Sequence, residues 1–314
     1  MDDREAMNRE KQRTARLSVA SNTLLVVLKL AVGLAIGSVA IVAEAVHSAI
    51  DLVAAVIAYF AVRASARPPD AEHAFGHGSY EDLSGLVEGA LILVAAVVIV
   101  WEAAGKLLAG GEGFEPAALG AGAAVMAVSG AVNWYVSGRL MRVAKKTESI
   151  ALESDAWHLR TDVYTSLGVF AGLIALYLTG IVALDALIAI AVALVILKAG
   201  YDLMRRASGN LVDQRLPEDE EATIREIIDS HGDNIAEFHD LRTRRSGPDR
   251  FVDLHLCVAH TLTVEESHAL ADGLESEIEA ALPRCSATIH VEPCSGSCEA
   301  CGTFCTVRAG PPEE

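Results

Sequence analysis

The hydrophobic and polar residues divide the chain into two parts. Up to residue 209, long apolar segments alternate with short polar connections; the segments cover residues 14–38, 40–66, 81–108, 115–141, 150–179 and 182–206. Each is long enough for the roughly 20 residues that a membrane-spanning helix requires. The pattern therefore predicts six transmembrane helices in residues 1–209.

From residue 210 the periodicity is that of a small water-soluble domain. Helical and alternating stretches follow one another at residues 218–229, 236–245, 250–259, 264–282 and 287–292, read as helix, strand, strand, helix and strand. Thr263 followed by Glu266 is the capping signature of the second helix. The order αββαβ predicts an α+β domain over residues 210–294. The last segment, 295–314, reads as a flexible tail rich in Gly, Cys and Pro.

Basic residues predict the orientation of the membrane domain. Lys and Arg cluster before the first apolar segment and after the second, fourth and sixth, whereas the connections after the first, third and fifth segments lack them. Positively charged connections stay on the cytoplasmic side. We therefore expect both termini in the cytoplasm of an inner-membrane protein, and we expect no cleavable signal peptide before the first segment.

Charge is segregated between the two parts. The formal net charge is −17, and residues 210–314 hold 22 acidic and 8 basic side chains, so 14 of these excess negative charges lie there. An acidic domain disfavours nucleic acid as a partner and is compatible with cations. All six cysteines lie after residue 256, four of them in residues 294–305, so a secreted disulfide framework is not expected.

One motif occurs twice inside the apolar segments. His47 and Asp51 lie four residues apart in the second segment, and His158 and Asp162 lie four apart in the fifth. Such positions share a helix face, so two adjacent helices would present two imidazoles and two carboxylates, a tetrahedral donor set suited to zinc. The alternative is a pair of structural contacts within the bundle. An aspartate at bilayer depth costs at least about 2.5 kcal/mol, which favours an ion site.

Two further groups of potential ligands lie outside the membrane segments. The loop after the second segment carries Asp70, His73 and His77 within eight residues, which can wrap one ion or can be incidental in a solvated loop. The second group is spread over the α+β domain and is either a set of ligands or a set of surface residues: His239, His255, His268, His290 and Glu292. In the tail, Cys294, Cys298, Cys301 and Cys305 are candidates for metal binding or for redox-labile thiols.

Together these motifs resemble the cation diffusion facilitator family, in particular its bacterial zinc and iron efflux members. The resemblance covers nearly the whole chain. Its most specific parts are the loop around His73 to Gly78, the stretch His239-Asp-Leu-Arg-Thr-Arg in the α+β domain, and the ending Ile289-His-Val-Glu-Pro.

The resemblance implies a homodimeric antiporter, not an enzyme, that exports divalent metal from the cytoplasm in exchange for protons. The paired His–Asp motifs would form the transport site, and the loop group a second site. The α+β domain would be ferredoxin-like and would bind regulatory zinc at the dimer interface, with His268 reaching across from the partner chain. Zinc is the expected ion, with cadmium, iron, cobalt and manganese as alternative substrates.

Three positions depart from close relatives. His47 stands where some have aspartate, and an imidazole there is associated with zinc preference. Glu292 replaces an aspartate. Ser79 replaces a lysine that in many relatives pairs with an aspartate at the position of Asp213 to lock the dimer, and Ser79 cannot supply that charge.

Other classes of function remain open on the sequence alone. A membrane metal sensor or storage protein would bind the same ions without transporting them. A membrane metallohydrolase is disfavoured because four protein ligands leave no open position for an activated water. A channel is disfavoured because no segment offers a wide polar lining.

Overall fold

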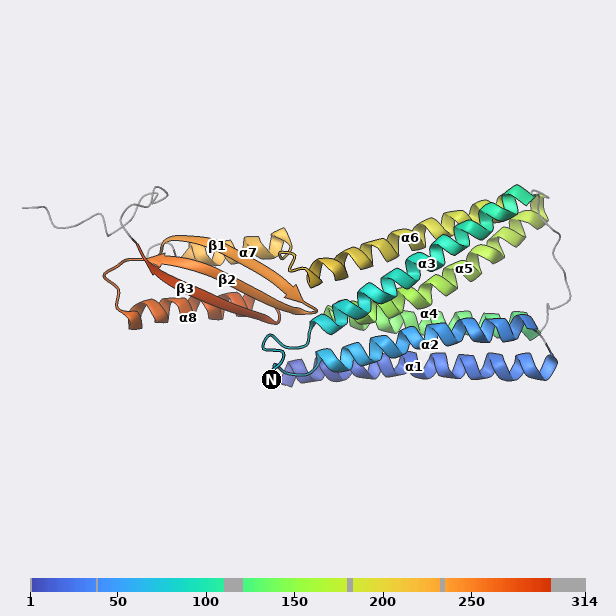
Figure 1. Cartoon of the computed structure of the whole chain (residues 1–314), viewed down its shortest axis with the longest axis horizontal. Coiled ribbons are helices and arrows are strands. Elements are labelled where there is room, and N and C mark those ends of the chain that lie inside the picture. Colours follow the sequence, from blue (N-terminus) through green and yellow to red (C-terminus); the bar gives the residue numbers. More distant parts are fainter. Residues whose placement is uncertain (1, 38, 110–120, 180–182, 232–234, 295–314) are drawn as a thin grey trace, which may run out of the picture. The chain divides into compact units, whose positions relative to one another are not determined.

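The computed structural model of the chain describes residues 2–37, 39–109, 121–179, 183–231 and 235–294. The chain divides into two compact units, Met1–Ser208 and Gly209–Glu314. The first is helical and the second combines helices with a sheet, as Figure 1 shows.

The first unit is a bundle of long helices, which in the described residues have these bounds: α1 Asp2–Ile36, α2 Val39–Ser65, α3 Ser79–Ala109, α4 Ala121–Thr147, α5 Ile150–Thr179 and α6 Ala183–Leu211. Gly37, at φ 65°, lies between α1 and α2, a backbone conformation that favours glycine. Each helix corresponds to one predicted apolar segment. The main shifts are that α1 begins 12 residues earlier than predicted and α4 ends 6 residues later.

Four of these helices are long and apolar enough to cross a membrane by composition: α1, α2, α3 and α6. The membrane domain is thus helical as predicted, whereas the number of six spans remains a prediction.

Small residues allow the helices of the bundle to approach closely. A side-chain carbon added at Gly85 of α3 would lie 3.2 Å from Ile150 and Ser154 of α5. One added at Gly200 of α6 would lie 2.9 Å from Ile92 of α3. Packing of backbones through glycine is a common way for membrane helices to associate. α3 therefore contacts both α5 and α6.

A buried ion pair links the N-terminal part of α1 to the start of α3. Lys11 Nζ of α1 donates to Glu81 Oε1 of α3 over 2.6 Å, and both side chains are fully buried. Ser65 at the end of α2 donates to the same oxygen over 2.6 Å, and Ser149, just before α5, donates to Glu81 Oε2. The polar segment expected before the first span is therefore part of α1, and its Lys11 lies inside the bundle.

The second unit has the predicted order of elements: α7 Glu218–Ser230, β1 Ile235–Ser246, β2 Asp249–Val258, α8 Val264–Ala281 and β3 Cys285–Pro293. The sheet order is β1-β2-β3, with β1 and β2 antiparallel and β2 and β3 parallel. One face of the sheet packs on both helices through a core that includes Leu254, Leu256, Ile228 and Leu274. The predicted capping box of Thr263 and Glu266 is present at the start of α8.

A bulge in β1 determines which of its side chains lie on the open face of the sheet, the face that does not pack on α7 and α8. His239 pairs with His255, but the next aligned pair is Arg242 with Asp253, so two residues of β1 oppose one of β2. Asp240 within this bulge has φ 51°. Bulges of this kind redirect side chains beside functional sites. Here the bulge leaves His239 on the same face of the sheet as His255.

Candidate metal sites

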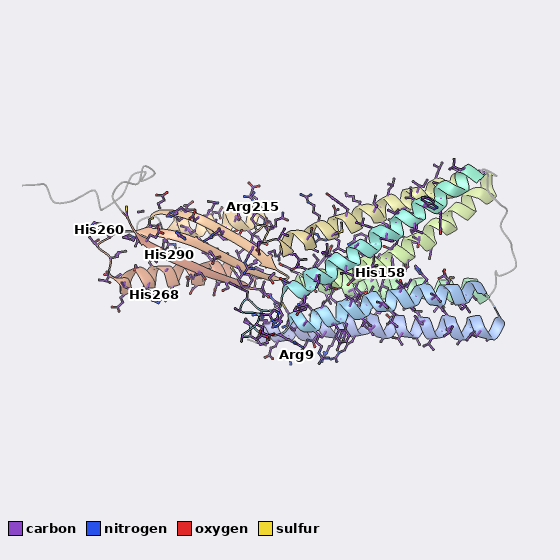
Figure 2. All side chains as sticks on the ribbon, in the orientation of Figure 1. Arg9, His158, Arg215, His260, His268 and His290 are labelled. Atoms are coloured by element: carbon purple, nitrogen blue, oxygen red, sulfur yellow. The ribbon has the colours of Figure 1, made fainter. Side chains whose placement is uncertain are left out.

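The two His–Asp motifs of the bundle meet crosswise. His158 of α5 has its Nε2 3.1 Å from Asp51 Oδ1 of α2, and His47 of α2 has its Nε2 3.5 Å from Asp162 Oδ1 of α5 (His158 is labelled in Figure 2). Ligand atoms of His47, Asp51 and Asp162 all lie within 4.8 Å of one another. The structure thus brings the four residues together, each imidazole against the carboxylate of the other helix.

Access to this group is uneven. The side chain of His47 is 57% exposed and that of Asp162 is 22% exposed, against 11% for His158 and 4% for Asp51. A cavity with a volume of about 80 Å³ adjoins the exposed pair, and it is lined by residues of α1, α2, α4 and α5 that include Lys29, Glu44, His47, Asn133 and Asp162. The group is reached from this cavity, on the side of the α1–α2 connection.

The sequence analysis did not identify two polar neighbours of the site. Asn133 Nδ2 of α4 donates to Asp162 Oδ2 over 3.4 Å. Lys29 Nζ of α1 donates to Ser48 Oγ over 2.8 Å and lies 3.3 Å from Glu44 Oε2. Lys29 could have been recognised from the sequence as a neighbour of the site. It lies inside the first apolar segment, and charged residues at that depth face a cavity or a partner.

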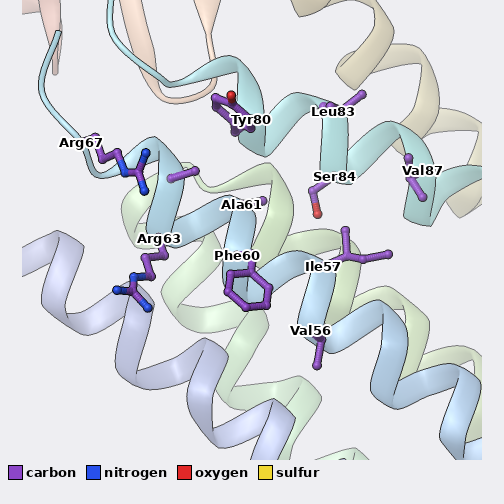
Figure 3. Close-up of a pocket in the computed structure, with 11 residues that line it drawn as sticks. Val56, Ile57, Phe60, Ala61, Arg63, Arg67, Tyr80, Leu83, Ser84 and Val87 are labelled. Carbon is purple, nitrogen blue, oxygen red and sulfur yellow. The ribbon is translucent and has the colours of Figure 1, made fainter. Parts of the chain in front are cut away.

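A larger groove lies elsewhere on the bundle. It has a volume of about 500 Å³ and is formed by α2 and α3, with apolar walls that include Ile57, Phe60 and Leu83 and with Arg63 and Arg67 at one end (Figure 3). Its lining contains no histidine, cysteine or carboxylate. The groove therefore has none of the donors that a divalent metal needs, and it is separate from the His–Asp group.

The loop group is also assembled. Asp70 Oδ1 lies 3.4 Å from His73 Nδ1, and Asp70 Oδ2 lies 3.2 Å from His77 Nε2. The rings of His73 and His77 are 4.4 Å apart. Backbone N–H groups of His73 and Glu72 donate to Asp70 Oδ1, and these hydrogen bonds hold the pKa of that carboxyl below its usual range. Gly76, at φ 86°, turns the chain back toward the group.

The open face of the sheet carries a third group. His255 Nδ1 lies 2.9 Å from Glu292 Oε1, His239 Nε2 lies 3.5 Å from Glu292 Oε2, and His290 Nε2 lies 3.7 Å from Glu292 Oε1. Imidazole and carboxylate at such distances fit a zinc ion, which binds both ligand types at about 2.0–2.2 Å. Cys257 also lies beside this group, 3.9 Å from His239 Nδ1, and the sequence analysis did not single it out.

His268 is apart from these residues. It lies on α8, its side chain is 74% exposed, and its Nδ1 lies 3.4 Å from Asp272 Oδ1 of the same helix (Figure 2). The donor groups found among the described residues do not include it. Cys298, Cys301 and Cys305 of the tail lie outside the described residues, whereas Cys294 is buried at the end of β3.

Asp213, the aspartate that such a lock would use, has a contact within its own chain. Arg244 Nη1 donates to Asp213 Oδ1 over 3.4 Å.

Comparison with known proteins identifies the family of the chain. Residues 15–212 match the family profile of the cation efflux transmembrane domain, and residues 216–294 match that of the cytoplasmic domain of cation efflux proteins. The chain is 36% identical over 279 residues to the uncharacterized transporter sll1263 of Synechocystis sp., covering 89% of each. It is 32% identical over 278 residues to the cation-efflux pump FieF of Yersinia pestis, covering 88% of this chain and 91% of the pump.

Two solved structures on the mode of action of CzrB, one in a Zn form, are 45% and 44% identical to this chain where they align. They cover 25% and 27% of this chain and 96% of their own, with TM-scores of 0.24 and 0.25. The two family profiles cover most of the sequence, and the curated relatives align over nearly all of it. The chain belongs to the cation diffusion facilitator family of bacterial cation-efflux transporters.

Proposed function

We propose that this transporter exports divalent metal cations, zinc foremost, from the cytoplasm in exchange for protons at the site formed by His47, Asp51, His158 and Asp162. The observation that carries the proposal is the crossed pairing of these residues between α2 and α5, with an adjoining cavity. Two imidazoles and two carboxylates make a tetrahedral set without an open position, which suits a bound and released cargo ion rather than metal-assisted hydrolysis.

Proton exchange follows from the ligand types. Zinc binds neutral imidazole and ionised carboxylate, so protons and zinc compete for the same atoms. A site that faces a near-neutral cytoplasm is deprotonated and binds the ion. The same site, when it faces a compartment richer in protons, takes up protons and releases the ion.

The direction of access supports an outward-facing arrangement. By the positive-inside bias, the α1–α2 connection lies outside the cell and both termini lie inside. The cavity beside His47 is on the side of that connection. Toward the termini, the bundle is filled by apolar side chains such as Leu140, Leu152 and Leu159 and by the buried Lys11–Glu81 pair. Rocking of α2 and α5 against the other helices would open the opposite side.

The remaining groups fit supporting roles. Asp70, His73 and His77 lie in the loop that the same bias places in the cytoplasm, where they would receive the ion. His239, His255, His290 and Glu292 would hold regulatory zinc in the cytoplasmic domain. His268 would join them from the partner chain of a homodimer, which fits its separation from the group within one chain. Zinc bound there would favour one arrangement of the dimer.

The decisive experiment is zinc flux in vesicles that contain the purified protein and an imposed pH gradient. We expect flux that depends on the gradient, and its loss in Asp51→Asn and in Asp162→Asn. Asp202→Asn is the matched control, because Asp202 is an exposed carboxylate of α6 outside the three groups. Undiminished flux in both site variants contradicts the proposal, and metal binding without flux in the unmodified protein favours a sensor or storage protein.

A further inference from the structure

Two cross-strand rows of side chains lie on the open face of the sheet in the cytoplasmic domain. The register aligns His239 of β1 with His255 of β2, and His255 with His290 of β3. One row further along, Cys257 of β2 is aligned with Glu292 of β3. Because side chains alternate between the two faces of a strand, Cys257 shares the face of His255 and adjoins the histidine row.

The donor atoms around Cys257 converge. Its Sγ lies 3.9 Å from His239 Nδ1, and the other ring nitrogen of His239 lies 3.5 Å from Glu292 Oε2. One ligand atom from each of the three residues lies within 4.8 Å of the other two. Ligand atoms of a tetrahedral zinc are about 3.3–3.6 Å apart, given bond lengths of about 2.0–2.3 Å. Small side-chain rotations would therefore bring the three onto one ion.

The surroundings suit a thiolate ligand. Cys257 is 8% exposed, so most of its surface is covered by protein. A ring nitrogen of His239 and the carboxylate of Glu292 beside Cys257 give the site nitrogen, oxygen and sulfur donors together. A buried cysteine can also act only as a small apolar side chain, and the test must separate these two roles.

We propose that Cys257 is a metal ligand, which together with His239 and Glu292 forms a thiolate-containing site that selects zinc and cadmium over manganese in the cytoplasmic domain. This inference rests on the proposed regulatory role of that domain, and it adds a ligand that the family resemblance did not supply. Thiolate favours soft and borderline ions, whereas manganese favours oxygen donors. The thiol gives the regulatory site a selectivity of its own, independent of the site in the bundle.

The test is titration of the full-length purified protein with cobalt(II), read by absorption. Cobalt bound to thiolate gives a near-ultraviolet charge-transfer band that histidine and carboxylate ligands do not give. The parent for this test carries Cys298→Ser, Cys301→Ser and Cys305→Ser, so that tail thiols do not contribute. We expect the band in this parent and its loss in Cys257→Ser and in Cys257→Val, which preserves apolar packing.

The matched control is Cys285→Ser. Cys285 lies at the other end of β3, where it is aligned with Arg250 and is five positions before His290, so it is outside the histidine row. The band should survive this change. A band that persists in both Cys257 variants overturns the assignment, because Cys285 or Cys294 would then be its source. A band that is absent from the parent overturns the assignment as well.

Competition between ions gives an independent readout. We expect Cys257→Val to weaken cadmium binding by at least about tenfold, since even partners outside the ligand set are worth 10–100-fold, and to leave manganese binding unchanged. Equal losses for both ions would indicate a damaged fold instead of a lost ligand, and would overturn the proposal. Vesicle flux reports on the proposed function separately: a chain that shows the cobalt band but no flux retains Cys257 as a ligand and loses the transport assignment.

Discussion

His47 is the residue at which metal preference in the bundle should be set. It is the most exposed of the four site residues, and it pairs with Asp162 across the two helices. An imidazole contributes a single nitrogen at a fixed angle, whereas a carboxylate can bind through one or both oxygens and accepts a larger ion. Because His47 lines the cavity, replacing this ligand would affect an ion that enters the site from there.

We therefore expect His47→Asp to raise the ratio of cadmium to zinc flux by roughly tenfold, which corresponds to about 1.4 kcal/mol of differential binding. The measurement is paired zinc and cadmium flux in the same vesicle preparation. Zinc flux must remain measurable, which shows that the variant still transports. An unchanged ratio would refute the role assigned to His47.

The ion pair between Glu220 and Arg250 in the cytoplasmic domain should make the stability of that domain depend on pH. Arg250 donates to both of its carboxylate oxygens over 2.7 Å from Nε and Nη2, and these bonds hold the pKa of Glu220 below its usual value near 4.5. A depressed pKa contributes stability above the unfolded-state pKa, and that stability is lost as the pH falls through the lower folded-state value.

Glu220→Gln should therefore destabilise the contact of α7 with β2 by about 1.5–3 kcal/mol at pH 7, the usual value for a hydrogen bond to a charged group. The difference from the unmodified protein should shrink below pH 4.5, as Glu220 itself becomes protonated. Amide hydrogen exchange of α7 measures this locally. A difference that stays constant down to the acid limit would show that the ion pair is not its cause.

At the scale of the element, the Lys11–Glu81 pair explains why the start of α1 is ordered in the bundle. The two residues are 70 positions apart in the chain and both are fully buried, with two serines completing the bonds to Glu81. Removal of one partner leaves an uncompensated buried charge, which costs about 3–5 kcal/mol, whereas removal of both is much less costly.

We expect Glu81→Gln to lower the stability of the bundle by about 3–5 kcal/mol, and the double change Lys11→Met with Glu81→Leu to recover most of that loss. The chain supplies a matched control: Lys146 and Glu10 also lie 2.6 Å apart, but they are 63% and 37% exposed. Glu10→Gln should cost under about 1 kcal/mol. Denaturant unfolding followed by circular dichroism compares the three variants, and equal losses for Glu81→Gln and Glu10→Gln would contradict the assigned effect of burial.

The elements show which features a sequence can predict. Helix and strand order, the capping box at Thr263 and the His–Asp spacing are local, because they depend on periodicity along one segment. Lys11 with Glu81 was missed because two distant charged residues give no local signal that they will meet. Cys257 was missed for a related reason: its place beside His239 depends on the pairing of β1 with β2 and on the bulge at Asp240.

At the scale of the whole molecule, the proposed homodimer divides the ligands of the proposed zinc site between two chains. Within one chain, His239, His255, His290 and Glu292 lie together, whereas His268 lies apart on α8 with Asp272 as its partner. If His268 completes the site of the partner chain, the site is composite, and neither chain holds it alone.

A mixture of two variants tests this directly. Chains with His268→Ala and chains with His290→Ala each form homodimers in which every composite site lacks a ligand, so both should lose metal-dependent stabilisation of the dimer. In a mixed dimer, the His290→Ala chain supplies His268 to the intact His290 and Glu292 of the other chain, which restores one of two sites. We therefore expect zinc to stabilise the mixed dimer, which would hold about half as many zinc sites as the unmodified dimer. Subunit exchange between tagged chains measures this stabilisation. Ligands drawn from a single chain would give no recovery, because neither variant chain is complete, and zinc would then act on each chain separately.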